Sequence, residues 1–442
     1  MTTHKHLKDV VRARMARTGE RYTTAHRHLT GAGSAPARTD ALPGYPRFGG
    51  GRHHDSALLT NVLAAAGVTA AHDGEPLDEP MVAGLAGGIG FMYFSFSYAG
   101  ELPTMTIVPR IHPRPFLAGA LERAGIAHRV SETTSPAKAA RDLDAALAAG
   151  RTPICTVDLA ALSHHTWADT MPGAAPYEVA VVGRRGDPTV DGVVLLDDDC
   201  LEPVAVPADE FAAARAAHRK SRHHMLVVES ATEPVDLVPA IRRSVAVTVH
   251  DLTDDVMPGN FAGNFGLRGL DKWADAVADR RGAKGWFRLF DSGPAFGHAM
   301  RRLHACLTHD YSSPGAMRPL YSEFLTSAAV LTADPALREA ADRYARAGEL
   351  WAEIADTAIG GAMAPYRPLV ERRLELLLGR GADATEELRE LTREVAALTT
   401  GLEVSEADRL TQLDAIGELA ARVVRVEKEA AAALAGSAAA TS

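Results

Sequence analysis

Two adjacent histidines stand directly before an apolar stretch, and their residue type is well suited to proton transfer. The run His53-His54-Asp55-Ser56 leads into the apolar positions of Leu58–Leu63, which predict a buried helix. An imidazole titrates close to neutral pH, so His54 could serve as a general base or carry an acyl group briefly. The simpler interpretation is that Asp55 or Ser56 caps the helix while His53 faces solvent.

A metal site is the other chemistry open to these histidines. Imidazole and carboxylate donors from separate loops suit zinc or iron, and His164, His165 or Asp197 could complete such a site. Adjacent histidines on one strand or turn usually point apart, which weighs against His53 and His54 binding one ion together. We therefore assign no metal ligand and no cofactor, and the metal site stays open as an alternative.

A second group of polar residues lies on a predicted hairpin. Apolar strands over 177–183 and 190–197 are separated by the turn-forming Gly186-Asp187-Pro188. The hydroxyl of Tyr177 could donate to a developing oxyanion, while Asp197–Asp199 follow at the end of the second strand. The simpler interpretation is a strand tyrosine packed against the core and an aspartate that ends a strand.

A glycine-rich segment, Gly84–Gly90, precedes an aromatic strand that begins near Phe91. Its glycine content resembles that of a phosphate-binding loop, but the Lys-Ser/Thr pair of such a loop does not follow. We therefore expect these glycines to allow close approach of the backbone beside an active cleft.

The three cysteines, Cys155, Cys200 and Cys306, are too few and too scattered for a disulfide framework. Apolar neighbours around Cys155 and Cys306 predict inert buried thiols. Cys200 follows three aspartates, whose charge would raise its pKa and reduce its reactivity. This usage is typical of a reducing compartment.

The composition is that of an ordinary globular protein. The 442 residues are 46% hydrophobic and 23% charged, with a formal net charge of −9. That acidic balance argues against a nucleic-acid binder, because phosphate contacts need positive surface. Without a membrane-span-length apolar run or a secretory signal, we expect a cytoplasmic protein. Abundant alanine and arginine indicate a high-GC genome of the actinobacterial kind.

Four segments differ in pattern along the chain. Residues 1–45 are a basic helical arm and linker, either a partner-binding arm or a solvated helix resting on the acidic remainder. Residues 46–232 alternate strand and helix signals and predict a mixed sheet flanked by helices. Residues 235–436 carry helical periodicity throughout, with the last two helices expected to pack as a hairpin. The tail, 437–442, is expected to be disordered.

Several of these segments together resemble a known family. GRHHDSALLTNVL, with Asn61 seven residues past His54, and GLAGGIGFMYFSF are similar to the amino-terminal domain of the butirosin-biosynthesis acyltransferase family. That family has a papain-like fold related to bacteriocin-processing cysteine peptidases. The later segments FAGNFGLRGLDKWADAV and GAMRPLYSEFLTSAA resemble a helical domain that often follows it. The resemblance implies a papain-like α/β domain followed by an all-α domain.

The resemblance also places a catalytic site, with departures from the family pattern. His54 stands where the family has its cysteine nucleophile, Tyr177 where it has its histidine base, and Asp197 at the acid position. Imidazole does not hold an acyl group stably, and a phenol is a poor base at neutral pH. Residues expected to contact substrate are His53, Ser56, Gly87, Gly88 and Phe91.

The function implied by the resemblance is a natural-product acyltransferase or amide-forming enzyme of antibiotic biosynthesis. Its donor would be an acyl group on an acyl carrier protein, its acceptor a small molecule, and its helical domain could mediate self-association. The alternative is a relative without thiol chemistry, re-purposed as a metal-dependent enzyme or as a pseudoenzyme that binds a metabolite or partner.

Overall fold

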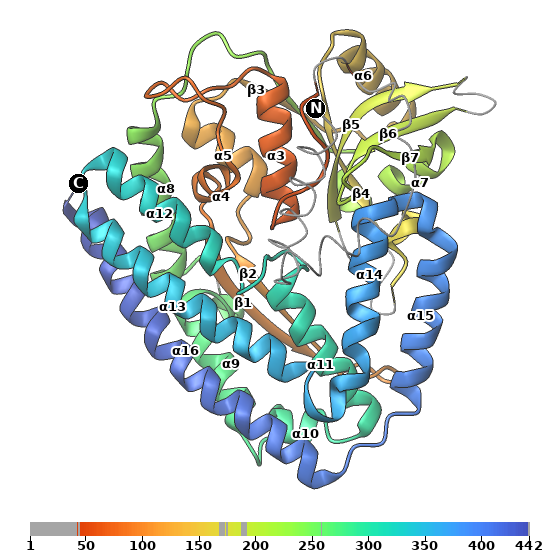
Figure 1. The fold of residues 1–442 in the computed structure, drawn as a ribbon, viewed down its shortest axis with the longest axis vertical. Helices are drawn as coiled ribbons and strands as arrows, with labels where there is room; N and C mark the ends of the chain where they lie inside the picture. The colour runs from red at the N-terminus through yellow and green to blue at the C-terminus, as the bar shows by residue number, and fades with distance from the viewer. Residues whose placement is uncertain are drawn as a thin grey trace, which may run out of the picture. The chain divides into compact units, whose positions relative to one another are not determined.

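The computed structural model describes residues 42, 45–167, 173, 176–186, 192–257 and 259–440 (Figure 1). All of the basic arm except Leu42 and Tyr45 lies outside the described residues, so its predicted role stays a prediction. The chain forms two compact units. The first contains the described residues up to Glu79 together with Gly125–Val235 and Val370–Glu394; the second contains Pro80–Ala124, Asp236–Leu369 and the residues from Val395 onward.

A six-stranded sheet organises the first unit, in the order β3-β8-β4-β5-β6-β7. Every neighbouring pair is antiparallel, so the expectation of a mixed sheet is wrong. Short connections such as the β5–β6 hairpin need no parallel crossover. The strands are β3 (His128–Ser131), β4 (Ile154–Asp158), β5 (Pro176–Arg185), β6 (Val193–Asp197), β7 (Val204–Pro207) and β8 (Met225–Val228).

Alternate residues of the central strands form the core of this unit. Val179 and Val181 of β5 are buried with Leu196 of β6 and Phe211 of a covering helix. The helices of the unit are α3 (His54–Ala65), α6 (Pro136–Ala148) and α7 (Ala208–Ala217), with two 3₁₀ turns, η1 (Leu159–Ala161) and η2 (Ser163–His165), after β4. Helix α3 packs against β5, as expected from the sequence. This contact brings the adjacent histidines to the hairpin.

The second unit is mostly helical but also contains a two-stranded antiparallel sheet. Strands β1 (Ile89–Phe96) and β2 (Thr104–Arg110) pair with each other, and helices α9 and α11 pack on them. The segment 80–124 therefore belongs with the helices, because its aromatic strand is buried among them. Helix α4 (Glu79–Leu85) begins one residue before the second unit starts at Pro80 and otherwise belongs to that unit. The other helices of the second unit are α5 (Phe116–Ala124), α8 (Leu237–Thr253), α9 (Gly266–Ala278), α10 (Trp286–Leu289), α11 (Gly293–Thr308), α12 (Arg318–Thr332), α13 (Pro335–Ala358) and α16 (Glu406–Ala440).

The C-terminal helices pack differently from the expected hairpin. Helices α14 (Arg367–Arg380) and α15 (Thr385–Thr400) share the apolar contacts of Leu376, Leu377 and Leu388. Helix α16 instead lies beside α13 (Figure 1). It continues through Ala440, so 437–440 are helical rather than disordered, and 441–442 lie outside the described residues.

The helical content beyond residue 235 confirms an α/β region followed by a mostly helical one, whereas the papain-like relationship stays a prediction. Among the described residues, no helix has the length and hydropathy to cross a membrane.

Candidate functional site

The first residue of α3, His54, is surrounded by groups from the β5–β6 hairpin. Its Nδ1 atom lies 3.0 Å from the hydroxyl of Tyr177 and 3.2 Å from Oδ1 of Asp199. Its Nε2 atom lies 2.6 Å from the carbonyl oxygen of Glu178. The imidazole also stacks on the ring of Tyr177, with centroids 4.2 Å apart. The structure thus brings together two of the three residues that the sequence placed in one site.

These contacts determine the charge of the imidazole. The carbonyl of Glu178 and the ionised carboxylate of Asp199 accept hydrogen bonds, so these contacts favour an imidazole with a proton on both ring nitrogens. Burial lowers the pKa of His54, but the hydrogen bond to Asp199 and the charges of Asp199, Asp55 and Asp198 outweigh it and raise that pKa to about 9. A pKa of about 9 favours the protonated imidazole at neutral pH, and the expectation that His54 acts as a general base stays a prediction.

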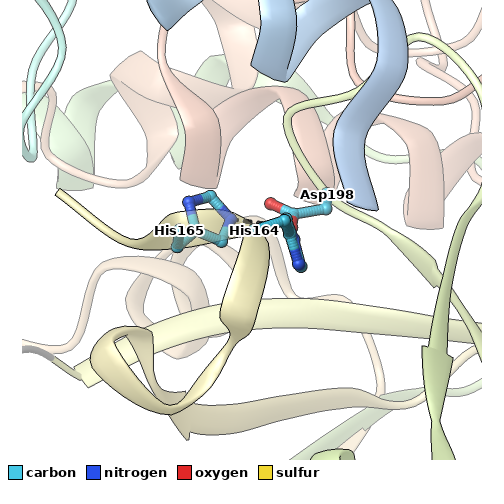
Figure 2. Close-up of side chains that lie close together, drawn as sticks. All are labelled: His164, His165 and Asp198. Atoms are coloured by element: carbon cyan, nitrogen blue, oxygen red, sulfur yellow. Dashed lines mark hydrogen bonds and ion pairs between the residues drawn. The ribbon is translucent and has the colours of Figure 1, made fainter. Parts of the chain in front are cut away.

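Tyr177 links His54 to a second group of polar residues. Its hydroxyl donates to Oδ1 of Asp198 at 2.7 Å, which leaves an oxygen lone pair for the Nδ1–H of His54. The other carboxylate oxygen of Asp198, Oδ2, lies 2.8 Å from Nε2 of His164 and 2.9 Å from Nε2 of His165 (Figure 2). Burial raises the pKa of Asp198, but the charges and hydrogen bonds of the two histidines hold it well below its usual range.

Asp197 belongs to a different network. Its carboxylate accepts hydrogen bonds from the backbone N–H of Gly49 at 2.6 Å, the hydroxyl of Tyr45 at 2.5 Å and the amide of Asn61 at 2.9 Å. The expected partnership of Asp197 with His54 is thus made by Asp199 instead. Burial raises the pKa of Asp197 to about 6, although the three donors oppose this shift. Asp197 and Asn61 hold the loop before α3 in place.

The start of α3 is capped by His53. The Nδ1 atom of His53 accepts from the backbone N–H of Ser56 at 3.3 Å, and the side chain is 1% exposed. The expectations that His53 faces solvent and that Asp55 or Ser56 caps the helix are therefore wrong. Glu79 accepts from the backbone N–H of His53 and from the Ser56 hydroxyl. With both side chains buried, direct substrate contact by His53 and Ser56 stays a prediction.

The glycines and the aromatic residue expected to contact substrate have close neighbours inside the second unit. A Cβ on Gly87 would lie 2.6 Å from Ile111, and one on Gly88 2.2 Å from the ring of Tyr321. Phe91 is 3% exposed and stacks on Trp351 with centroids 5.9 Å apart. Close packing therefore accounts for glycine at 87 and 88 and for the aromatic ring at 91. The expectation that Gly84–Gly90 lies beside an active cleft stays a prediction.

The cysteines lie in the core, as expected. Cys155, Cys200 and Cys306 are all buried. Burial raises the pKa of Cys155 to about 11 and that of Cys200 to about 12, and it also raises the pKa of Cys306. These shifts disfavour the thiolate form of all three cysteines at neutral pH.

The sequence placed Asp197–Asp199 at the end of the hairpin, but it assigned a role only to Asp197, whereas Asp198, Asp199 and the Glu178 carbonyl make most of the site's polar contacts. The run of three aspartates at the end of β6 indicated an acidic group at this place. Because the three residues are chemically identical, their type could not show which of them contacts His54. The solvent-reaching edge consists of His54, Tyr177 and Asp199, which are partly exposed. A protonated imidazole and a carboxylate at one edge can donate and accept a proton in the same reaction.

Comparison with protein families agrees with the resemblance seen in the sequence. Residues 53–197 match the family described as "Butirosin biosynthesis protein H, N-terminal", and residues 209–371 match a domain of unknown function, DUF4872. None of the curated proteins compared matches the chain. The family description links the first domain to butirosin biosynthesis, which is consistent with an enzyme of secondary metabolism.

Proposed function

Because the chain contains the N-terminal domain of the butirosin biosynthesis protein H family, followed by DUF4872, we propose that it is an acyltransferase of secondary metabolism. Its donor is an acyl thioester on a carrier protein, and its acceptor is an amine or hydroxyl of a small molecule. Transfer is direct, without an acyl-enzyme intermediate.

The observation that carries this proposal is the environment of His54, at the position of the family's nucleophile. A thiolate there would lie close to the carboxylates of Asp199 and Asp198, which would repel it. The same carboxylates stabilise a cation. The site therefore suits a positively charged proton donor, which favours catalysis without a covalent intermediate.

In the proposed reaction the acceptor attacks the thioester carbonyl carbon. The oxyanion that forms accepts the Nδ1–H of His54, which is shared between Tyr177 and Asp199 before substrate enters. Asp199 takes the proton that the acceptor loses. The carbon–sulfur bond then breaks, and the departing thiolate takes up that proton, so the products are an amide or ester and a free thiol.

The test is a transfer assay with a panel of acyl-pantetheine thioesters and small amines. His54→Ala should lower the rate by roughly two to four orders of magnitude, the usual span for loss of a general acid or base. His223→Ala is the matched control, because His223 belongs to another adjacent histidine pair in the same unit and should leave the rate unchanged.

Mass spectrometry of the protein with donor alone tests the direct mechanism. We expect no acyl adduct, since the raised pKa of His54 favours its imidazolium form and the three cysteines are buried. An adduct on a cysteine, or full activity of His54→Ala, would contradict the proposal. Binding of the thioesters with no transfer would favour the pseudoenzyme alternative.

A further inference from the structure

Three buried side chains converge on one point below the solvent-reaching edge of the site. His164 and His165 come from the η2 turn after β4, and Asp198 comes from the end of β6 (Figure 2). Their exposed fractions are 1%, 2% and 2%. One ring nitrogen of each histidine and a carboxylate oxygen of Asp198 all lie within 4.8 Å of one another.

The conformation of the two histidines is unusual for neighbours in sequence. Adjacent side chains of an extended chain point to opposite sides, as His53 and His54 do in making separate contacts. The 3₁₀ turn instead directs Nε2 of both His164 and His165 to the same oxygen, Oδ2 of Asp198. Among the described residues, Nδ1 of His164 has no hydrogen-bond partner, so its polar contact is made at Asp198 alone.

Both oxygens of the Asp198 carboxylate are fully used by their polar neighbours. Oδ1 of Asp198 accepts from the Tyr177 hydroxyl and from the backbone N–H of Asp199, both at 2.7 Å. The two imidazole nitrogens then share the remaining carboxylate oxygen, Oδ2, so that four neighbours match the four lone pairs of the carboxylate. The same three groups, two imidazole nitrogens and one carboxylate oxygen, are also a frequent ligand set for zinc and for divalent iron.

The distances also suit a shared ion. Ligands around an ion with bonds of about 2.1 Å lie about 3.4 Å apart in the tetrahedral geometry of Zn²⁺ and about 3 Å apart when they are at right angles. The observed separations of 2.8 and 2.9 Å between Asp198 and the two histidines are close to the right-angle value and about half an ångström shorter than the tetrahedral one. Small rotations of the side chains would open the space for the ion.

We propose that His164, His165 and Asp198 form a binding site for a divalent first-row transition-metal ion, with Zn²⁺ as the reference ion. Two imidazole nitrogens and one carboxylate oxygen leave at least one coordination position for water or for a group of the substrate. Because Tyr177 contacts both Asp198 and His54, an ion bound here would lie directly behind the partners of His54. The proposal concerns metal binding and does not depend on acyl transfer.

The experiment is a calorimetric titration of Zn²⁺ into the full-length chain after treatment with a chelator and its removal. We expect one ion per chain. His164→Ala and His165→Ala should each weaken binding by about a hundredfold or more, since even loss of a residue supporting a ligand costs ten- to hundredfold. His223→Ala, from the other adjacent histidine pair, should bind like the wild type.

Co²⁺ in place of Zn²⁺ gives a readout that needs no variant. The X-ray absorption spectrum of the bound Co²⁺ should show two imidazole ligands in the wild type. This result tests whether histidines bind the ion even if a histidine variant fails to fold. No binding by the wild type at millimolar Zn²⁺, binding unaffected by both variants, or a Co²⁺ spectrum without imidazole would each overturn the proposal. The metal titration contains no substrate. A protein that transfers no acyl group would therefore still be expected to bind the ion.

Discussion

The carboxylate of Asp199 lies 3.2 Å from Nδ1 of His54, the first residue of α3. This pairing stabilises a positive charge at the start of α3, where a helix by itself favours negative charge. The side chains that surround position 54 are therefore matched to an imidazolium and poorly matched to a thiolate.

Replacing the paired carboxylate should impair catalysis more than it impairs the fold. Asp199→Asn keeps the size of the side chain but removes the charge that holds His54 protonated and the acceptor for the substrate proton. We expect the transfer rate to fall by about ten- to a hundredfold or more. The assay is the thioester transfer described above, and an unchanged rate would contradict the role given to Asp199.

Asp197→Asn should instead act on stability. Asp197 is buried, and its carboxylate accepts hydrogen bonds from Gly49, Tyr45 and Asn61. Asparagine would replace one of the accepting oxygens with an NH₂ group, which cannot accept these hydrogen bonds. We expect the free energy of unfolding to fall by about 2 kcal/mol, measured by urea denaturation. A variant as stable as the wild type would show that this network does not hold the loop before α3.

Thiol reagents should leave activity intact. All three cysteines are buried, and their raised pKa values keep them as thiols at neutral pH. We expect iodoacetamide to modify the folded protein slowly and the transfer rate to stay within error of the untreated sample. Loss of activity that Cys155→Ala or Cys200→Ala reproduces would identify a cysteine nucleophile after all.

The charge of His54 should make stability depend on pH. Its pKa rises from 6.5 to about 9 in the folded protein, so the folded state binds this proton more tightly than the unfolded chain does. The resulting stabilisation, about 3 kcal/mol, is complete below pH 6.5 and is lost as pH rises through 9. In chelator-treated protein, the difference in unfolding free energy between wild type and His54→Gln should shrink across this range. A difference independent of pH would contradict the shift.

Local patterns were sufficient to predict the elements that carry the site. The apolar run after His54 predicted α3, and the alternation in 177–183 and 190–197 predicted the β5–β6 hairpin. Both signals depend on residues close together in the sequence. The pairing of His54 with Tyr177 came from the family resemblance, because 123 residues separate the two side chains.

Choosing among three adjacent aspartates needed the structure. Successive side chains point to different sides of an extended chain, and that alternation ends with β6 at Asp197. A shift of one residue in the end of the strand would exchange the partners of Asp197, Asp198 and Asp199. The convergence of His164 and His165 was equally hidden, because it depends on a 3₁₀ turn that sequence periodicity does not predict.

The protonation state of His54 at neutral pH tests the central claim most directly. Nuclear magnetic resonance of chelator-treated protein labelled with ¹⁵N-histidine distinguishes an imidazolium from either neutral tautomer, and His54→Gln assigns the signal. We predict that both ring nitrogens of His54 carry a proton at pH 7.5, and that the signal titrates near pH 9. A neutral imidazole at pH 7.5, titrating near its ordinary pKa of 6.5, would contradict a site built around a cation.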